Sequence, residues 1–198
     1  MVGSDDETRA VYDARAADYA KMGREAGLEP IEQAFLDRVG PGGRILDFGC
    51  GPGRTAAAMR DAGHPVDALD ASPEMAKLAK DKFGLDVTVA PFDSLTAKAL
   101  YDGVWASFSL LHVPKADLPP LLTAIHQALK PGGQLHVSVK LGMGEARDSI
   151  GRFYAYYTDA ELTALLEAAG FTVTERDFGT SPGLSGDRAP WIALAAHA

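Results

Sequence analysis

The stretch from Arg44 to Arg54, R-I-L-D-F-G-C-G-P-G-R, decides the fold. Its apolar start is typical of a buried parallel strand, and Asp47 stands where we expect that strand to end. An Ala-rich helix is predicted to follow over residues 55–60. Every second residue between them is a glycine: Gly49, Gly51 and Gly53. Glycine tolerates positive φ and a helix N-terminus has free N–H groups, so this unit predicts a site for a ligand's carboxylate or phosphate.

Two common nucleotide-binding motifs do not fit this turn. The dinucleotide fingerprint requires a glycine five residues after Gly49, where this chain has Arg54, and Pro52 stands inside the turn. The phosphate loop requires a Lys-Ser or Lys-Thr pair, which is absent. What remains, D-F-G-C-G-P-G, resembles motif I of the class I methyltransferases that use S-adenosylmethionine. A glycine turn without a ligand is the alternative.

An acidic residue follows the second predicted strand. Asp70 ends the strand predicted at 66–69 and lies 21 residues after Gly49, a spacing typical of a carboxylate that binds ribose hydroxyls. Nicotinamide and S-adenosylmethionine enzymes share this feature. Asp70 could instead cap the next helix, but Ser72, followed by proline, fits that role better. The resemblance places Ala71 and Met75 near the adenosine.

Phe92 and Asp93 follow the third predicted strand, at 86–90. In the family that this chain resembles, a carboxylate at this point accepts a hydrogen bond from the adenine amino group, and an apolar neighbour packs on the ring. That pairing is chemically sound because the amine donates and the carboxylate accepts. A helix cap at Asp93 is the alternative.

The loop after the fourth predicted strand, at 101–106, should border the methyl group, because ligands of open parallel sheets collect beyond the strands' carboxyl ends. Ser107 begins this loop. His112 is its candidate general base, since its pKa suits proton transfer near neutral pH. A structural role for His112 is the alternative.

The N-terminal segment is predicted as a helix from Asp5 to Met22, with Tyr12 and Tyr19 on its apolar stripe. The resemblance implies that such a helix closes over the cofactor, so that residues 1–40 form a helical cap; packing alone is the alternative. In all, the resemblance and the positions above assign these residues to the cofactor: Asp47, Gly49, Cys50, Gly51, Asp70, Ala71, Met75, Phe92, Asp93, Ser107 and Tyr19.

The segment 141–157 is a candidate substrate lid. It carries Arg147, Arg152 and four aromatic residues, a composition that suits an anionic or aromatic substrate. A helix with its charges in water and its rings in the core is the alternative. The remaining predicted elements are helices at 30–39, 115–130 and from Thr158 to residue 169, strands at 134–140, 171–177 and 191–196, and a polar turn at 179–188.

Composition narrows the classes of protein. The 198 residues are 46% hydrophobic and 23% charged, which suits one globular domain. A net charge of −8 disfavours nucleic acid as a partner, and the single cysteine excludes an intrachain disulfide. The sequence has neither a membrane-length apolar run nor a signal-peptide core, so we expect a cytoplasmic protein. No convincing metal-ligand spacing is present, and the oligomeric state is not predicted.

Alternating strands and helices predict a parallel sheet covered on both faces. The two strands predicted last form a hairpin, so one terminal strand should be antiparallel. With the resemblance, the predicted fold is α/β: a Rossmann-like, doubly wound, mostly parallel seven-stranded sheet in a single domain, residues 1–198. The resemblance implies methyl transfer from S-adenosylmethionine to an unidentified acceptor, expected to be a small metabolite. The alternatives are a non-catalytic S-adenosylmethionine-binding protein and an NAD(P)-dependent reductase.

Overall fold

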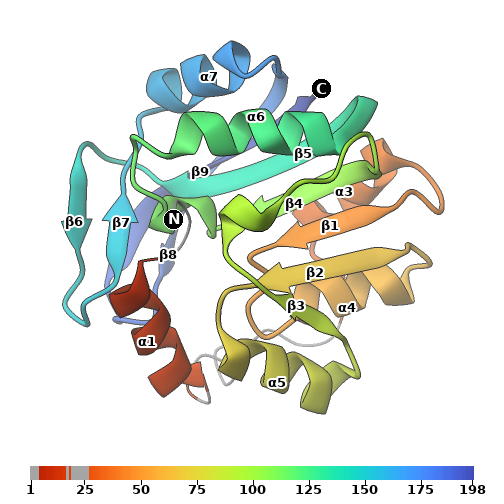
Figure 1. The fold of residues 1–198 in the computed structure, drawn as a ribbon. Helices are drawn as coiled ribbons and strands as arrows, with labels where there is room; N and C mark the ends of the chain where they lie inside the picture. The colour runs from red at the N-terminus through yellow and green to blue at the C-terminus, as the bar shows by residue number, and fades with distance from the viewer. Residues whose placement is uncertain (1–4, 17, 19–26) are drawn as a thin grey trace.

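The computed structural model describes residues 5–16, 18 and 27–198. Its centre is a seven-stranded sheet, drawn in Figure 1. The strands lie in this order across the sheet: β3 (Val87–Val89), β2 (Val66–Asp70), β1 (Ile45–Phe48), β4 (Tyr101–Ser107), β5 (Leu129–Lys140), β9 (Arg188–His197) and β8 (Thr172–Pro182). The first five are parallel to one another, whereas β9 runs antiparallel to both of its neighbours. The predicted fold class is confirmed.

Helices cover both faces of the sheet. On one face lie α6 (Leu118–Ala128) and α7 (Asp159–Ala168), and on the other lie α3 (Pro30–Val39), α4 (Arg54–Asp61) and α5 (Pro73–Phe83) (Figure 1). Strand β1 shows why its sequence is continuously apolar. Ile45 packs with α3 and α4, while Leu46 packs in the core beneath α6 and α7. Both faces of this strand are buried, as expected for a parallel sheet.

The topology creates a crevice beside β1. The chain adds strands outward from β1 through β2 to β3, and then crosses to β4 on the other side of β1. Ligands of open α/β sheets bind at such a point, beyond the carboxyl ends of the strands. The glycine turn, Asp70, Ser107 and Lys140 all lie at these ends, since they follow or close β1, β2, β4 and β5.

Several boundaries differ from the prediction, most of all at two places. Helix α6 ends at Ala128 rather than residue 130, and β5 begins at Leu129 rather than residue 134 because Leu129 pairs with Tyr101 of β4. Strand β8 continues to Pro182 and β9 begins at Arg188, so half of the polar stretch predicted as a turn is strand and residues 183–187 connect the two strands. The backbone of residues 179–182 pairs with β9, which outweighs the polar composition of this stretch.

The predicted lid segment contains a hairpin rather than a helix. It consists of β6 (Glu145–Arg147) and β7 (Phe153–Ala155), which form a separate two-stranded sheet. Helix α1 (Asp6–Ala14) lies beside this hairpin (Figure 1), because the Thr8 hydroxyl accepts a hydrogen bond from the Phe153 N–H at 2.8 Å. Helix α1 ends at Ala14, whereas the sequence predicted a helix that reaches Met22. Tyr19 and Met22 lie outside the described residues.

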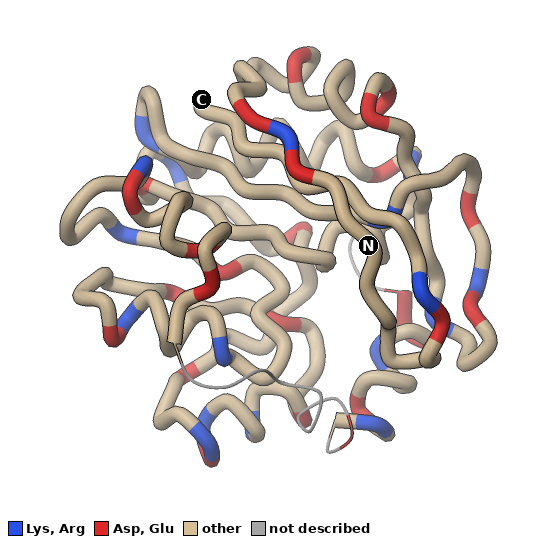
Figure 2. Tube along the Cα trace, turned by 180° about the vertical axis from the view of Figure 1, so that it is seen from behind, with Lys and Arg blue, Asp and Glu red and all other residues tan. Residues whose placement is uncertain are grey.

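Two single-turn 3-10 helices complete the fold: η1 (Phe92–Ser94) follows β3, and η2 (Leu110–His112) follows β4. Charged residues of both signs are interspersed along the trace, as Figure 2 shows. Among the described residues, no helix is long and apolar enough to cross a membrane.

Candidate cofactor and acceptor site

The glycine turn needs its glycines. Gly49, Gly51 and Gly53 all have positive φ, at 85°, 53° and 79°. A Cβ on Gly49 would lie 2.3 Å from the Cβ of Ser109, and one on Gly53 would lie 2.8 Å from the Cβ of Ala79. The turn leaves no room for side chains at these two positions, so its backbone packs directly against the loop after β4 and against α5.

Asp70 ties the glycine turn to the start of α5. One carboxylate oxygen accepts a hydrogen bond from the Gly51 N–H at 2.8 Å, and the other accepts from the Ser72 N–H at 2.9 Å. Burial raises the pKa of Asp70. Ser72 is the N-cap of α5, because its hydroxyl accepts from the Met75 N–H at 3.0 Å. The Ala71 N–H is a further donor to this carboxylate, whose roughly four lone-pair sites still leave it able to accept from a ligand hydroxyl.

Asp47 is a buried carboxyl with an unused oxygen. Its side chain lies inside β1 rather than at the strand end, and the residue is 3% exposed. Burial raises its pKa to about 8, and the negative charges of Asp70 and Glu32 act in the same direction. Its Oδ2 has no hydrogen-bond partner among the residues that the structure describes. Such an oxygen suits a ligand that brings its own donor, above all a cationic one.

Arg54, the residue that breaks the dinucleotide fingerprint, has a structural partner. Its guanidinium forms a salt bridge with the buried Glu32 of α3, and it donates to the Gly27 carbonyl at 2.9 Å. The Thr55 hydroxyl donates to the same Glu32 carboxylate at 3.0 Å. The ion pair therefore joins the first turn of α4 to α3 beside the glycine turn.

The loop after β4 is held by serine hydroxyls. The hydroxyls of Ser107 and Ser138 lie 3.0 Å apart, and the Ser109 hydroxyl donates to the Phe48 carbonyl at 2.6 Å. Phe108 between them adopts a left-handed φ of 52°, with its N–H directed at the Ser138 carbonyl at 3.0 Å. This conformation is uncommon for a bulky residue, so the surrounding hydrogen bonds must stabilise it.

His112 stands in a network that uses both of its ring nitrogens. Its Nδ1 lies 2.6 Å from the Phe153 carbonyl, which can only accept, so Nδ1 carries the proton. Its Nε2 then accepts from the Tyr12 hydroxyl at 2.8 Å, and that hydroxyl accepts from Arg152 at 3.1 Å. Burial lowers the pKa of His112 to about 4. The imidazole is therefore neutral at pH 7, and the lone pair on its Nε2 already accepts the hydrogen bond from the Tyr12 hydroxyl.

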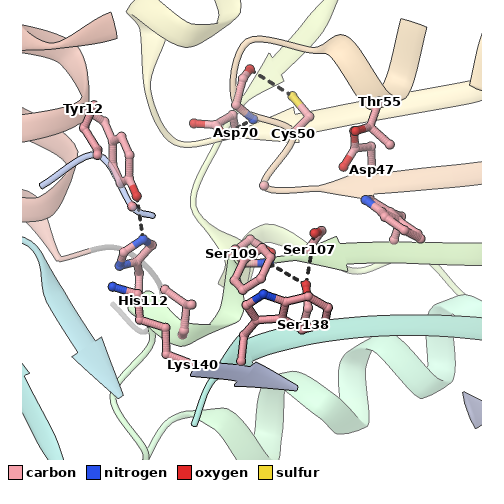
Figure 3. A pocket seen from close by; sticks show the side chains of 18 of the residues that line it. Tyr12, Asp47, Cys50, Thr55, Asp70, Ser107, Ser109, His112, Ser138 and Lys140 are labelled. Atoms are coloured by element: carbon pink, nitrogen blue, oxygen red, sulfur yellow. Dashed lines mark hydrogen bonds between the residues drawn. The ribbon is translucent and has the colours of Figure 1, made fainter. Parts of the chain in front are cut away.

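These groups line one cavity of about 740 Å³. Figure 3 shows Asp47, Cys50 and Asp70 on one side of it and Tyr12 and His112 on the other. We call the first side the glycine-turn half; it comprises Asp47, Gly49, Cys50, Gly51, Asp70, Ala71, Met75 and Phe92. We call the second side the aromatic half; it comprises Tyr12, Phe108, His112, Lys140, Arg152, Tyr154 and Trp191. Ser107 and Ser138 lie between the two.

The structure brings nearly all of the predicted site residues together. Every residue assigned to the cofactor lines this cavity except two. Asp93 lies exposed on η1 and is not part of the cavity wall. Tyr19 lies outside the described residues. The adenine contact of Asp93 and the cofactor contact of Tyr19 therefore stay predictions.

Several cavity residues were missed by sequence reasoning. Lys140 could have been found, because it closes β5 at the same sheet edge as the glycine turn. Trp191 and Glu32 gave no such signal, since they reach the cavity from β9 and α3. His136 also lines the cavity, and its ring stacks on Trp105 with 3.7 Å between centroids. Among the described residues, no group of three or more histidine, cysteine or acidic side chains could hold a metal ion.

A protein-family model described as a methyltransferase domain matches residues 19–176 of the 198. The chain belongs to this methyltransferase family. The resemblance to the class I S-adenosylmethionine-dependent methyltransferases is thereby confirmed.

Curated relatives include O-methyltransferases. The chain is 36% identical over 128 residues to a ubiquinone biosynthesis O-methyltransferase of Xanthomonas campestris pv. campestris, an alignment that covers 59% of this chain and 53% of that protein. It is 30% identical over 164 residues to the malonyl-[acyl-carrier protein] O-methyltransferase of Erwinia pyrifoliae, covering 77% of this chain and 59% of that protein. The chain thus spans little more than half the length of these curated relatives.

A solved structure with bound ligands has the same fold. It is Burkholderia thailandensis 1,6-didemethyltoxoflavin-N1-methyltransferase, with bound 1,6-didemethyltoxoflavin and S-adenosylhomocysteine. The two superpose with a TM-score of 0.76 and share 27% sequence identity, covering 96% of this methyltransferase and 86% of that chain.

Proposed function

We propose that this chain transfers a methyl group from S-adenosylmethionine to a small-molecule acceptor. One observation carries the proposal: the glycine turn and Asp70 form one half of a cavity whose other half is aromatic and cationic. A cavity of about 740 Å³ is of the size that ligand sites have, with distinct surroundings for a donor and an acceptor.

The residues of the glycine-turn half fit the proposed cofactor. Asp70 would accept hydrogen bonds from the ribose hydroxyls, and the unpartnered Oδ2 of Asp47 suits the cationic amino group. Phe92 and Met75, which are both buried in the cavity wall, would pack on the adenine.

When bound, S-adenosylmethionine supplies a methyl group that is already activated by its sulfonium. The chain must therefore mainly hold the acceptor in line with that methyl group and exclude water. Such alignment can supply about 7–11 kcal/mol of the barrier. A general base is needed only for an acceptor that binds with its proton. His112 was the candidate, and its engagement with Tyr12 means that any base role would pass through the Tyr12 hydroxyl.

The proposal extends to the class of acceptor, the cellular location and the role of residues 141–157. The acidic composition, with a net charge of −8, favours a metabolite over nucleic acid as acceptor. We propose a cytoplasmic location and a covering role for residues 141–157, supported by the hairpin β6–β7 that contributes Arg152 and Tyr154 to the cavity.

Titration calorimetry tests the proposal. We expect S-adenosylmethionine and S-adenosylhomocysteine to bind and NAD not to bind, because Arg54 occupies the position where the dinucleotide fingerprint needs glycine. Binding of NAD alone would overturn the proposal in favour of a reductase. Binding of both sulfur compounds with no turnover on any acceptor of a broad metabolite panel would favour a non-catalytic binding protein.

A further inference from the structure

Building on the proposed function, we propose that the aromatic half binds a planar acceptor as an anion, a phenolate or enolate whose charged oxygen lies on the Lys140 ammonium. The methyl group would then be transferred to that oxygen. The contacts, charges and shape of the aromatic half each support this assignment.

Lys140 is a cation held in the cavity wall. It closes β5 opposite Trp191 of β9, and its Nζ lies 3.8 Å from the centroid of the Tyr154 ring. This cation–π contact fixes the ammonium at the aromatic half without neutralising it. Among the residues that the structure describes, no carboxylate forms a salt bridge with Lys140, although the side chain is partly buried.

The other cations of this region are already paired. Arg152 is 2% exposed and forms a salt bridge with Asp148 at 2.7 Å, and Arg147, which is not part of the cavity wall, pairs with Asp5 at 2.8 Å. Burial and the charge of Arg152 lower the pKa of Lys140, while the carboxylates of Asp148 and Asp187 act in the opposite direction. With His112 neutral and Arg152 paired with Asp148, Lys140 is left without a salt bridge among the described residues, and an anionic acceptor would supply one.

The walls around Lys140 are flat. Phe108 is 38% exposed, and its ring stands at 89° to that of Trp191, with 6.1 Å between the centroids. The left-handed backbone of Phe108 holds its ring in this position. Tyr154 adds a third ring below the ammonium. Aromatic walls of this kind suit a planar conjugated acceptor, which can stack on one ring and meet the edge of another.

With an anionic acceptor, methyl transfer needs no general base. A lone pair of the phenolate oxygen forms the new O–C bond, the S–C bond breaks, and its electron pair stays on sulfur. One cation and one anion become a neutral ether and a neutral thioether, and the acceptor's proton has left for solvent on binding. This agrees with a histidine whose two nitrogens are both occupied.

The charge balance also predicts how Lys140 acts. The oxygen loses its charge as the new bond forms, so the ammonium stabilises the bound acceptor more than the transition state. Lys140 is therefore a specificity-determining residue. Its loss should raise the KM for the acceptor without lowering kcat, at a pH where the acceptor is ionised in solution.

The test uses 4-nitrophenol, whose phenolate is yellow, and 4-nitroanisole, its neutral methyl ether, as probes with saturating S-adenosylhomocysteine. We expect the protein to bind the phenolate at least about tenfold more tightly than the ether, and to shift the colour change of the bound probe to lower pH. Lys140→Met should abolish this preference without changing the affinity for the ether. Lys140→Arg should restore most of it.

Two controls separate the possible failures. Lys130→Met removes a lysine that pairs with Asp102 outside the cavity, and should leave the binding of both probes unchanged. S-adenosylhomocysteine affinity, measured by calorimetry in every variant, reports on the proposed function alone. Normal S-adenosylhomocysteine binding with equal affinity for both probes, with neither probe bound, or with no effect of Lys140→Met overturns the inference only. A wild-type protein that binds no S-adenosylhomocysteine overturns the proposed function and this inference with it.

Discussion

The two halves of the cavity are built in opposite ways. The glycine-turn half comes mainly from two short stretches, residues 47–51 and 70–75, and much of it is bonded through backbone groups. The aromatic half collects single side chains from α1, the loop after β4, β5, β7 and β9. Changes at the glycines of the first half alter backbone geometry, whereas the second half can change one side chain at a time.

The largest expected effect comes from the backbone of the glycine turn. Gly49→Ala should lower the free energy of unfolding by about 2–5 kcal/mol, because the new Cβ lies 2.3 Å from that of Ser109 at a φ of 85°. Gly63→Ala is the matched control, since Gly63 has a φ of 98° with nothing within 4 Å of a built Cβ. It should cost about 1–2 kcal/mol from backbone strain alone. Urea unfolding of both variants measures the difference, and equal costs would show that the turn has room to spare.

Asp70→Ala tests the ligand contacts of the same half. We expect the affinity for S-adenosylhomocysteine to fall by about 100-fold, since the ligand hydroxyls and the Gly51 and Ser72 N–H groups all lose their acceptor. Asp93→Ala is the control. Asp93 is exposed and outside the cavity wall, so its loss should change affinity by less than about threefold. A large loss with Asp93→Ala would restore the adenine contact predicted from the sequence.

Asp47→Asn separates stability from binding. Burial raises the pKa of Asp47 to about 8, so the native state binds more protons than the unfolded state between pH 4 and pH 8, and stability falls as pH rises through that range. Without the ligand, the variant should be more stable than wild type at pH 8, by about 1–2 kcal/mol. It should also bind S-adenosylmethionine more weakly. Thermal unfolding at pH 5 and pH 8 tests the first expectation; a variant less stable at pH 8 would contradict it.

His112, in the aromatic half, makes the free energy of unfolding change with pH in the opposite direction from Asp47. Burial lowers its pKa to about 4, so the unfolded state binds more protons between pH 4 and pH 6.5, and this contribution to stability is lost as pH falls through that window. His112→Asn should make the loss of stability below pH 6.5 shallower, by about 1 kcal/mol. Urea unfolding at pH 5 and pH 7 in both proteins measures this. An unchanged slope would show that the imidazole is already protonated in the folded protein.

The contrast between the halves also explains what the sequence could predict. Motif spacing and the family resemblance predicted the fold, the glycine turn and Asp70, because short stretches of sequence carry these features, and the Ser72 cap depends on a contact only three residues along the chain. The hairpin β6–β7 and the long β8 were missed, since cross-strand pairing outweighed their local composition. The aromatic half was seen only in pieces: Arg152 and His112 were singled out, but nothing in the sequence joins them to Tyr12.

If one cavity holds two separately built sites, a change in one half should leave ligand binding in the other half intact. Calorimetric titration of S-adenosylhomocysteine into Asp70→Ala and Lys140→Met side by side tests this. We expect about 100-fold weaker binding to the first variant and an affinity within about threefold of wild type for the second. Comparable losses in both variants, or wild-type affinity in Asp70→Ala, would contradict it.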